Sequence, residues 1–420
     1  MPDRTFHIIT FGCKANQYDS QLWRTALEDA ELVPNDLDPD LCLVNTCAVT
    51  TAAEQQARQT IRKLIRAFPR AKVAVIGCYG QLSGPELQQI YGVGLVLGRH
   101  SPEAVANLFN WLGLGHYNKP VGIKSFRGHT RAFLKVQDGC DHRCSYCIVP
   151  LARGPSRSRP LDVILREAEN LVAAGHRELV VTGVRLGDYK PSLGMLLRSL
   201  NGLPGLLRLR LSSLEPDDLQ DDLVETMGEV PLLARHLHLP LQSGSDAILR
   251  KMNRPYTVSN YMSLLNRLRR AMPDITMGSD IIVGFPGETE ELFGQGLRNV
   301  MEMGFNHLHL FTYSRRPGTP AASMAGQIPE NIKKERHHRL KEMFEHVRQK
   351  QLADSSGSME QVLAESCQDG LWSGLGEHYQ RIYFRESGDV GNRLVQVCLL
   401  EPFQQGMLGS PLLHEEVPGC

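Results

Sequence analysis

The stretch that decides the fold is residues 137–147, Gln-Asp-Gly-Cys-Asp-His-Arg-Cys-Ser-Tyr-Cys, in which Cys140, Cys144 and Cys147 have the spacing Cys-x-x-x-Cys-x-x-Cys. Three thiolates this close can bind three irons of a cubane iron–sulfur cluster and leave the fourth iron open to a small molecule. The alternative is a zinc site, which usually has paired Cys-x-x-Cys arms or a downstream histidine. Residues 148–154 contain neither Cys nor His, so the spacing favours a cluster.

Upstream, residues 1–115 alternate between short apolar runs and amphipathic segments. We expect strands at residues 6–11, 41–45, 72–76 and 94–97, and helices at 18–30, at 51–68, from 85 and from 102. Regular alternation of this kind predicts an α/β domain with a doubly wound parallel sheet.

Three further cysteines follow successive strands of this predicted sheet. Cys13 follows the first strand, Cys47 the second and Cys78 the third. Because the carboxyl ends of parallel strands share one edge, where ligands bind, we expect these thiols to converge on a second cluster. The alternative is three buried apolar cysteines, which is the interpretation that we give to Cys42 inside a strand.

Downstream, residues 126–355 contain six expected strands with helices between them, and polar or glycine-rich turns follow the strands. The strands are expected at residues 131–136, 178–182, 207–211, 236–239, 275–283 and 307–311. This pattern predicts a parallel barrel, or part of one, with its chemistry at the carboxyl ends of the strands. His307 and His309 alternate along the last strand, and we interpret them as core histidines rather than ligands.

Residues 356–420 have the pattern of a small antiparallel β-barrel, with strands expected at 361–365, 379–385 and 394–400. This part carries three Lys and Arg against nine Asp and Glu, so attraction of nucleic-acid phosphates to it is doubtful. Cys367, Cys398 and Cys420 are scattered here and are interpreted as core or tail residues.

Composition limits the class of protein. The chain has 420 residues, enough for two or three domains, and its formal net charge is zero. No segment resembles a signal peptide or a membrane span, and ten cysteines then indicate metal binding in the reducing cytoplasm rather than disulfides. Residues 120–160 are locally basic, with eight Lys and Arg against two Asp, and Arg153, Arg157 and Arg159 are our candidates for contacting a polyanion.

The stretch around Cys140 resembles the radical SAM superfamily, including the aromatic Tyr146 before the last cysteine. The wider match resembles the methylthiotransferase family, on residues 138–140, 144–150, 152–154 and 157–159 and on residues 12–17, 45–50 and 77–79 around the other cysteines. The resemblance implies a partial (βα)6 radical SAM barrel over residues 126–355 and a methylthiotransferase domain over residues 1–115. It also implies a TRAM-like barrel at the C-terminus, 356–420.

The resemblance further implies two 4Fe–4S clusters, an auxiliary one on Cys13, Cys47 and Cys78 and a catalytic one on Cys140, Cys144 and Cys147. S-adenosyl-L-methionine (SAM) would be bound with the help of Tyr146, Gly183 and Glu215. One SAM would methylate a sulfur held at the auxiliary cluster. A second would be cleaved reductively to a 5′-deoxyadenosyl radical, with electrons from an unidentified flavodoxin- or ferredoxin-like donor.

The implied activity is that of a tRNA methylthiotransferase. Residues 12–20, with Lys14 after the first cysteine, resemble the branch that adds a 2-methylthio group to N6-threonylcarbamoyladenosine at tRNA position 37. Lys14 could pair with the carboxylate of the threonylcarbamoyl group, or it could face solvent or offset the charge of the cluster. The alternatives are the branches that act on isopentenyladenosine of tRNA or on a ribosomal-protein aspartate, and a non-enzymatic iron–sulfur carrier, whose clusters should be fully ligated.

Overall fold

The computed structural model describes residues 4–117 and 122–412, which form two compact units. The first contains residues up to 174, 182–189 and 314–323, and the second contains residues 175–181, 190–313 and 324 onwards. Each is described by itself below. Cys420 lies outside the described residues, as do residues 118–121 between the first two expected domains.

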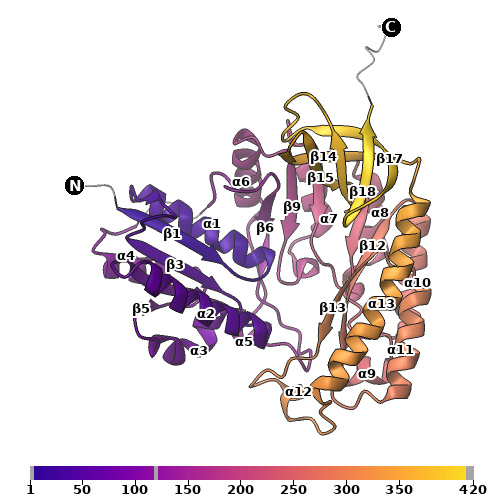
Figure 1. Cartoon of the computed structure of the whole chain (residues 1–420), viewed down its shortest axis with the longest axis horizontal. Helices are drawn as coiled ribbons and strands as arrows, with labels where there is room; N and C mark the ends of the chain where they lie inside the picture. The colour runs from indigo at the N-terminus through magenta and orange to yellow at the C-terminus, as the bar shows by residue number, and fades with distance from the viewer. Residues whose placement is uncertain (1–3, 118–121, 413–420) are drawn as a thin grey trace. The chain divides into compact units, whose positions relative to one another are not determined.

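The first unit begins with a five-stranded parallel sheet in the order β2-β1-β3-β4-β5 (Figure 1). Its strands are β1 (Thr5–Thr10), β2 (Val33–Pro34), β3 (Leu41–Thr46), β4 (Lys72–Gly77) and β5 (Val93–Val96), and its helices are α1 (Lys14–Asp29), α2 (Thr51–Ala67), α3 (Cys78–Gln88) and α4 (Pro102–Leu112). The four expected strands are confirmed, and the short edge strand β2 is an addition.

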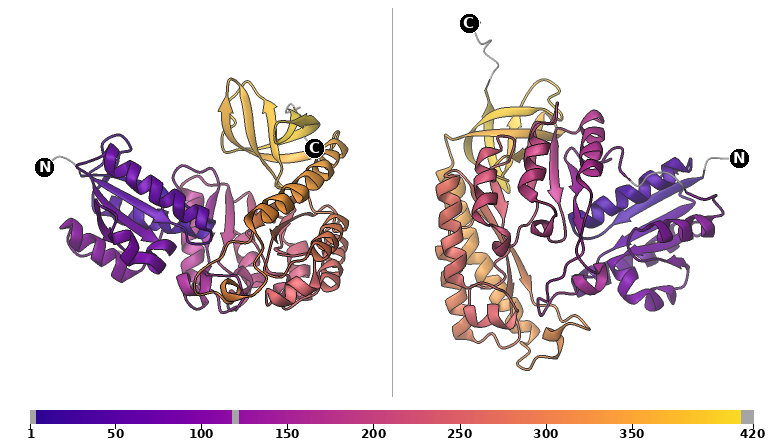
Figure 2. Two further views of the ribbon diagram at one scale, coloured as in Figure 1. Left: turned by 60° about the horizontal axis from the view of Figure 1, so that its bottom comes forward. Right: turned by 180° about the vertical axis from the view of Figure 1, so that it is seen from behind.

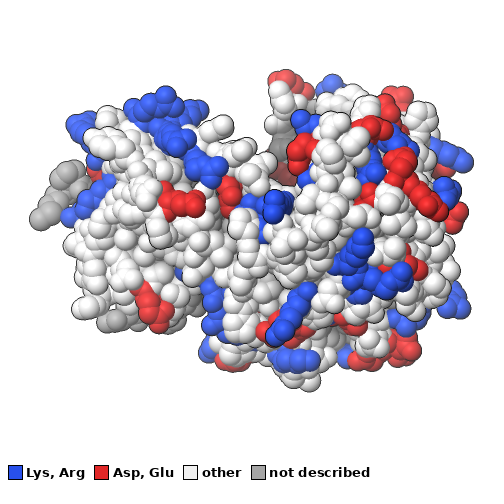
Figure 3. Space-filling view, turned by 90° about the horizontal axis from the view of Figure 1, so that it is seen from below, with Lys and Arg blue, Asp and Glu red and all other residues white. Residues whose placement is uncertain are grey.

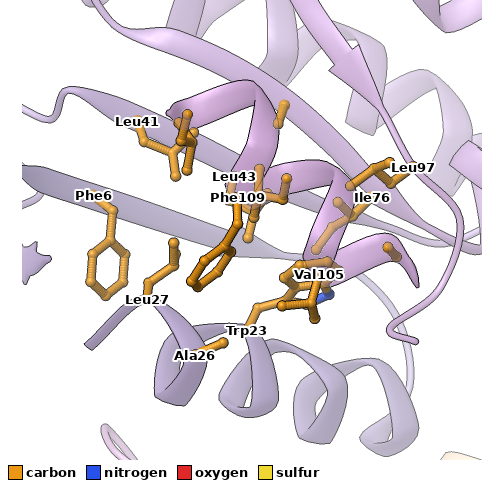
Figure 4. Close-up of a cluster of buried hydrophobic side chains, with 14 of the residues drawn as sticks. Phe6, Trp23, Ala26, Leu27, Leu41, Leu43, Ile76, Leu97, Val105 and Phe109 are labelled. Carbon is orange, nitrogen blue, oxygen red and sulfur yellow. The ribbon is translucent and has the colours of Figure 1, made fainter. Parts of the chain in front are cut away.

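Both faces of this sheet are covered by helices, as expected for a doubly wound fold. On one face Trp23 and Leu27 of α1 pack with Val105 and Phe109 of α4 against the sheet (Figure 4). On the other face Ile61 and Leu64 of α2 pack with Leu87 of α3. Hydroxyl caps begin two of these helices, Thr50 for α2 and Ser101 for α4, by accepting from backbone N–H groups of the first turn.

The remainder of the first unit surrounds the loop with Cys140, Cys144 and Cys147. It contains β6 (Ala132–Lys135), β7 (Gln137–Asp138), α5 (Val149–Arg153), β8 (Arg157–Ser158), α6 (Leu161–Ala173), a 3-10 turn (Leu186–Asp188) and α12 (Pro320–Ser323). Ala152 of α5 joins the same hydrophobic cluster as Cys42 and Cys78. The segment that follows Cys147 therefore packs into the core of the N-terminal sheet.

The second unit contains further parallel strands. Parallel pairing joins β9 (Glu178–Thr182) to β10 (Arg208–Leu211), and β12 (Thr276–Val283) to both β11 (His236–His238) and β13 (His307–Thr312). An isolated parallel bridge joins Leu209 of β10 to Leu233, three residues before β11. The helices are α7 (Leu193–Asn201), α8 (Asp221–Glu229), α9 (Asp246–Lys251), α10 (Val258–Ala271), α11 (Glu290–Glu302) and α13 (Glu330–Asp354), with a 3-10 turn at Pro216–Asp218. With β6, all six strands expected between residues 126 and 355 are confirmed.

The chain ends in a closed five-stranded barrel in the order β14-β15-β16-β18-β17 (Figure 2). Its strands are β14 (Met359–Gln368), β15 (Leu371–Gly376), β16 (Arg381–Arg385), β17 (Leu394–Phe403) and β18 (Gly406–Pro411). The expected barrel is confirmed, but β15 and β18 were not predicted, and β16 pairs with β18 in parallel. Cys398 is partly buried. Cys367 is exposed on β14, so the interpretation of Cys367 as a core or tail residue is wrong.

Candidate functional site: two cysteine triads

The first triad, Cys13, Cys47 and Cys78, lies at the carboxyl edge of the N-terminal sheet. Cys13 caps the start of α1, Cys47 directly follows β3, and Cys78 directly follows β4 as the first residue of α3. A Cβ atom built on Gly12 would lie 3.0 Å from the Cys47 sulfur. The loop before Cys13 therefore lies directly against Cys47, and the lack of a side chain at residue 12 permits it. Cys47 and Cys78 are buried and Cys13 is exposed, so the triad has one open side.

The electrostatics of this triad suit a cationic ligand. Burial raises the pKa of the Cys47 thiol and raises that of Cys78 to about 11, and the neighbouring thiols add to both shifts. The nearby Arg153 guanidinium acts in the opposite direction on both. The two buried sulfurs, those of Cys47 and Cys78, are therefore poorly suited to carry thiolate charge alone. Iron bound to the sulfurs would offset these charges, so the donor set fits a cluster.

Asn16, three residues after Cys13, holds the loops of this triad together. Its amide nitrogen donates to the carbonyl oxygens of Phe11 at 2.9 Å and Thr46 at 3.0 Å, which precede Cys13 and Cys47. Its oxygen accepts from the Cys78 sulfur at 3.7 Å and from Arg153 at 2.5 Å. One buried side chain thus contacts the surroundings of all three cysteines. Its neighbour in this layer, Asn45, donates to the Asn16 carbonyl at 2.8 Å.

The second triad, Cys140, Cys144 and Cys147, lies on one loop and is partly exposed. The Cys140 backbone N–H donates to the Gly154 carbonyl at 3.0 Å, which closes the loop on α5. The Cys140 sulfur accepts from the His142 N–H at 3.4 Å. Burial raises the pKa of Cys140, the His142 N–H and the Arg185 guanidinium lower it, and the neighbouring Cys144 raises it. Three partly exposed cysteines on one loop provide sulfur donors that also fit a cluster.

The residues expected to bind SAM fall in both units. Tyr146 is half-buried in the cysteine loop. Gly183 lies against the same region, because a Cβ atom there would lie 3.0 Å from the Gln137 amide oxygen. Glu215 lies in the second unit, where its carboxylate accepts from the Arg254 guanidinium. Tyr146 and Gly183 therefore both belong to the first unit, and Glu215 belongs to the second.

Gln137 organises this region and was not singled out in the sequence. Its oxygen accepts from the Arg185 N–H at 2.9 Å, and its nitrogen donates to the Gly139 carbonyl and the Ser156 hydroxyl, each at 2.8 Å. It thereby joins the turn after Gly183 to the loop that carries Cys140. The signal available in the sequence was a glutamine directly after the expected strand at 131–136 and three residues before Cys140.

Two of the three arginines expected to contact a polyanion are committed to internal partners. Arg153 is 2% exposed and pairs with Asp19 at 3.1 Å and Asp138 at 2.8 Å. Arg159 pairs with Glu167 at 2.9 Å. Only Arg157 of the three is exposed, so the expectation is wrong for Arg153 and Arg159. A local count of charges could not show that Arg153 pairs with Asp19, which lies 134 residues away in the sequence.

Comparison with known proteins gives two matching families. Residues 134–298 match the Radical SAM superfamily, and residues 5–98 match the uncharacterized protein family UPF0004. A radical SAM methyltransferase of Kitasatospora setae, TsrM, aligns with a TM-score of 0.56 at 17% identity, covering 76% of this chain and 77% of that one. The fold and the cysteine loop therefore define a radical SAM enzyme.

Curated relatives match almost the whole chain. Threonylcarbamoyladenosine tRNA methylthiotransferase MtaB of Thermotoga maritima is 38% identical, covering 93% of this chain and 92% of its own, and that of Bacillus subtilis is 33% identical, covering 96% and 95%. The tRNA-2-methylthio-N(6)-dimethylallyladenosine synthase of Erythrobacter litoralis is 34% identical, covering 97% of each chain. The chain belongs to the radical SAM tRNA methylthiotransferase family. Its cofactors are 4Fe–4S clusters, of which methylthiotransferases of this family carry two, and S-adenosyl-L-methionine.

Proposed function

We propose that this enzyme adds a 2-methylthio group to N6-threonylcarbamoyladenosine at position 37 of tRNA. The observation that carries the proposal is the similarity, over more than nine-tenths of the chain, to two relatives with that named activity. Relatives named for the dimethylallyladenosine product match at similar identity. Isopentenyladenosine is therefore the alternative substrate that the experiment must separate.

The site assignment is part of the same proposal. Cys140, Cys144 and Cys147 hold the catalytic cluster, Cys13, Cys47 and Cys78 hold the auxiliary cluster, and Tyr146, Gly183 and Glu215 contribute to the SAM pocket. When bound, the first cluster supplies the electron that cleaves SAM, and the second carries the sulfur that is methylated and transferred. The protein's own part is to fix the cysteine loops, through Asn16 at one triad and Gln137 at the other, and to limit the access of water to the buried thiols.

Lys14 is our candidate for recognising the substrate. It directly follows Cys13, is the first residue of α1 and is half-buried. A lysine ammonium on the residue next to Cys13 can form a charge-assisted hydrogen bond with the threonylcarbamoyl carboxylate, which the isopentenyl group lacks. A site built for such a bond discriminates strongly against a ligand that cannot make it.

The proposal extends to the organisation of the chain and to its partners. We assign residues 1–115 to the methylthiotransferase domain, 126–355 to the radical SAM core and 356–420 to a TRAM-like barrel, in keeping with the matched regions. The electron donor is of the flavodoxin or ferredoxin type. None of the described helices has the length and apolar character of a membrane span. A cytoplasmic location is consistent with cysteines that form no disulfide in the described residues.

The test is the nucleoside composition of tRNA from a deletion strain, measured by mass spectrometry. We expect the 2-methylthio form of threonylcarbamoyladenosine to disappear and the 2-methylthio isopentenyl form to remain. Complementation with Lys14→Met should restore less product than Lys14→Arg, with unmodified threonylcarbamoyladenosine accumulating. Loss of the isopentenyl product instead would move the enzyme to the neighbouring branch. Loss of neither product would direct the search to ribosomal proteins.

A further inference from the structure

A group of polar side chains lies on one face of the strands β11, β12 and β13 in the second unit. None of these side chains is close in sequence to a cysteine of either triad. His238, Asp280 and His309 come from these three neighbouring strands, and Asp280 is the direct register partner of His309. Residues that alternate with them, such as Leu237 and Ile281, are buried in the hydrophobic core. The pleat therefore directs the three polar side chains together to the opposite face.

The distances within this group are those of a ligand set. Oδ1 of Asp280 lies 2.9 Å from Nε2 of His238 and 3.2 Å from Nδ1 of His309. All three ligand atoms lie within 4.8 Å of one another. Zinc binds imidazole nitrogen and carboxylate oxygen at about 2.0–2.2 Å, which separates neighbouring ligand atoms by about 3.3–3.6 Å in a tetrahedral site. The contact of Asp280 with His309 is close to this separation, and its contact with His238 is shorter, so binding would require a small outward movement of the His238 ring.

The backbone leaves room for the two imidazoles. Gly278 is the register partner of both His238 and His307. A Cβ atom built on Gly278 would lie 2.9 Å from Nδ1 of His238. The ring of His238 therefore occupies space that a side chain at residue 278 would need, and it stacks on the His309 ring with centroids 5.0 Å apart.

The charge of the group favours a cation over an anion. Asp280 places a carboxylate within hydrogen-bond distance of both imidazoles. An anionic ligand would meet this carboxylate at the centre of the group, whereas a metal ion could be bound by the carboxylate oxygen and the two imidazole nitrogens together.

The group is also accessible. The side chain of His309 is 55% exposed, that of Asp280 23% and that of His238 12%. The exposure of His309 shows that its interpretation as a core histidine is wrong. His307 packs against Tyr379, with ring centroids 5.6 Å apart. An ion could thus reach the site from solvent and keep water in its remaining coordination positions.

We propose that His238, Asp280 and His309 form a binding site for a divalent first-row transition metal, with zinc as the probe ion. Two imidazoles and one carboxylate are a ligand set that suits zinc and its neighbours and lacks the sulfur that would favour an iron–sulfur cluster. Three protein ligands leave at least one position for water or for an anionic oxygen of a ligand. This inference does not depend on the identity of the tRNA substrate.

The experiment uses anaerobically reconstituted enzyme with its cluster cysteines occupied. After dialysis against a weak chelator, zinc is titrated, and bound zinc and iron are measured together by mass spectrometry. We expect one equivalent of zinc in the wild type with unchanged iron. The isosteric Asp280→Asn variant and the His238→Ala variant should lose this zinc and keep their iron, which also reports that they are folded.

The matched control is His338→Ala. His338 pairs with Glu342 at 3.1 Å on α13, a histidine–carboxylate pair without a third ligand among the described residues. This variant should keep the full equivalent of zinc. Cobalt should give the d–d bands of nitrogen and oxygen ligation without a thiolate charge-transfer band. Absence of zinc from the wild type, zinc retained by Asp280→Asn, or a thiolate band with cobalt would each overturn the proposal.

Discussion

The guanidinium of Arg153 donates to the carboxylate of Asp138 at 2.8 Å, and this ion pair joins the end of α5 to the residue two before Cys140. The same guanidinium donates to Asp19 of α1 at 3.1 Å and to Asn16 at 2.5 Å. Burial lowers the pKa of Arg153, but Asp19, Cys78 and Asp138 outweigh this and raise it well above its usual value. One buried cation thus connects the surroundings of both cysteine triads.

We predict that Arg153→Met strongly destabilises the first unit. Removing one partner of a buried ion pair leaves uncompensated carboxylates and typically costs about 3–5 kcal/mol. Lys135 also contacts Asp19 and Asp138 and should moderate the loss. The measurement is anaerobic urea unfolding of the metal-free protein, followed by tryptophan fluorescence. Arg157→Met, which removes a nearby exposed arginine, is the control and should change the unfolding free energy by less than about 0.5 kcal/mol. Equal stability of the two variants would contradict the role assigned to Arg153.

The two triads should separate by function. Reconstituted enzyme is expected to hold about eight irons, four for each cubane. Replacement of Cys140 by Ala should lower this to about four and stop reductive cleavage of SAM. Replacement of Cys78 by Ala should also lower it to about four, but should spare cleavage and stop methylthiolation. Cys42→Ala is the control, because Cys42 is buried inside β3 and should keep the full iron content and activity. Product from the Cys78 variant would refute this division.

Binding of tRNA should weaken with salt, and the exposed arginines should carry this dependence. Lys and Arg are interspersed with Asp and Glu on the face drawn in Figure 3, so specific side chains rather than net charge must supply the attraction. Arg62 and Arg66 are exposed on α2, and Arg157 is exposed after the cysteine loop. Changing all three to Gln should reduce the slope of log affinity against log salt by about 0.7–0.9 for each phosphate that an arginine no longer neutralises. Arg339→Gln is the control, since Glu290 already pairs with it at 2.6 Å. An unchanged slope in the triple variant would exclude these three arginines from phosphate binding.

The convergence of Cys13, Cys47 and Cys78 could be predicted because it follows from topology alone: each comes at the carboxyl end of a parallel strand. The partners of Arg153 could not, because its contacts with Asp19 and Asn16 span more than 130 residues of sequence. A local excess of Lys and Arg gives no information on which of them are internally neutralised.

The strands β15 and β18 were missed for a different reason. Both contain glycines that local sequence rules assign to turns. In the barrel, however, a Cβ atom on Gly374 would lie 1.9 Å from the Leu363 carbonyl oxygen, so glycine is required where two paired strands approach closely. Tertiary packing therefore reversed the local preference.

Within the second unit, the barrel is attached to β9 and β10 through a buried ionic group centred on Glu178. This fully buried carboxylate of β9 accepts from Arg210 at 2.8 Å and from Arg208 at 3.4 Å. Arg208 also donates to the Gln361 carbonyl at 2.6 Å, and Arg210 to the Gly376 carbonyl at 2.9 Å. Both arginines thus bond the carboxylate on one side and backbone oxygens of the barrel strands on the other.

We predict that Glu178→Gln weakens this attachment, because two buried guanidinium charges lose the carboxylate that they share on β9, a change that typically costs about 3 kcal/mol or more. The measurement is limited proteolysis at increasing urea, with the release of a C-terminal fragment that begins near residue 355. Release should occur at lower urea in the variant than in the wild type. Arg381→Gln, which removes the half-exposed pair of Arg381 with Glu365 within the barrel, is the control and should leave release unchanged. If Glu178→Gln resisted proteolysis as the wild type does, the ionic group would have no part in holding the barrel.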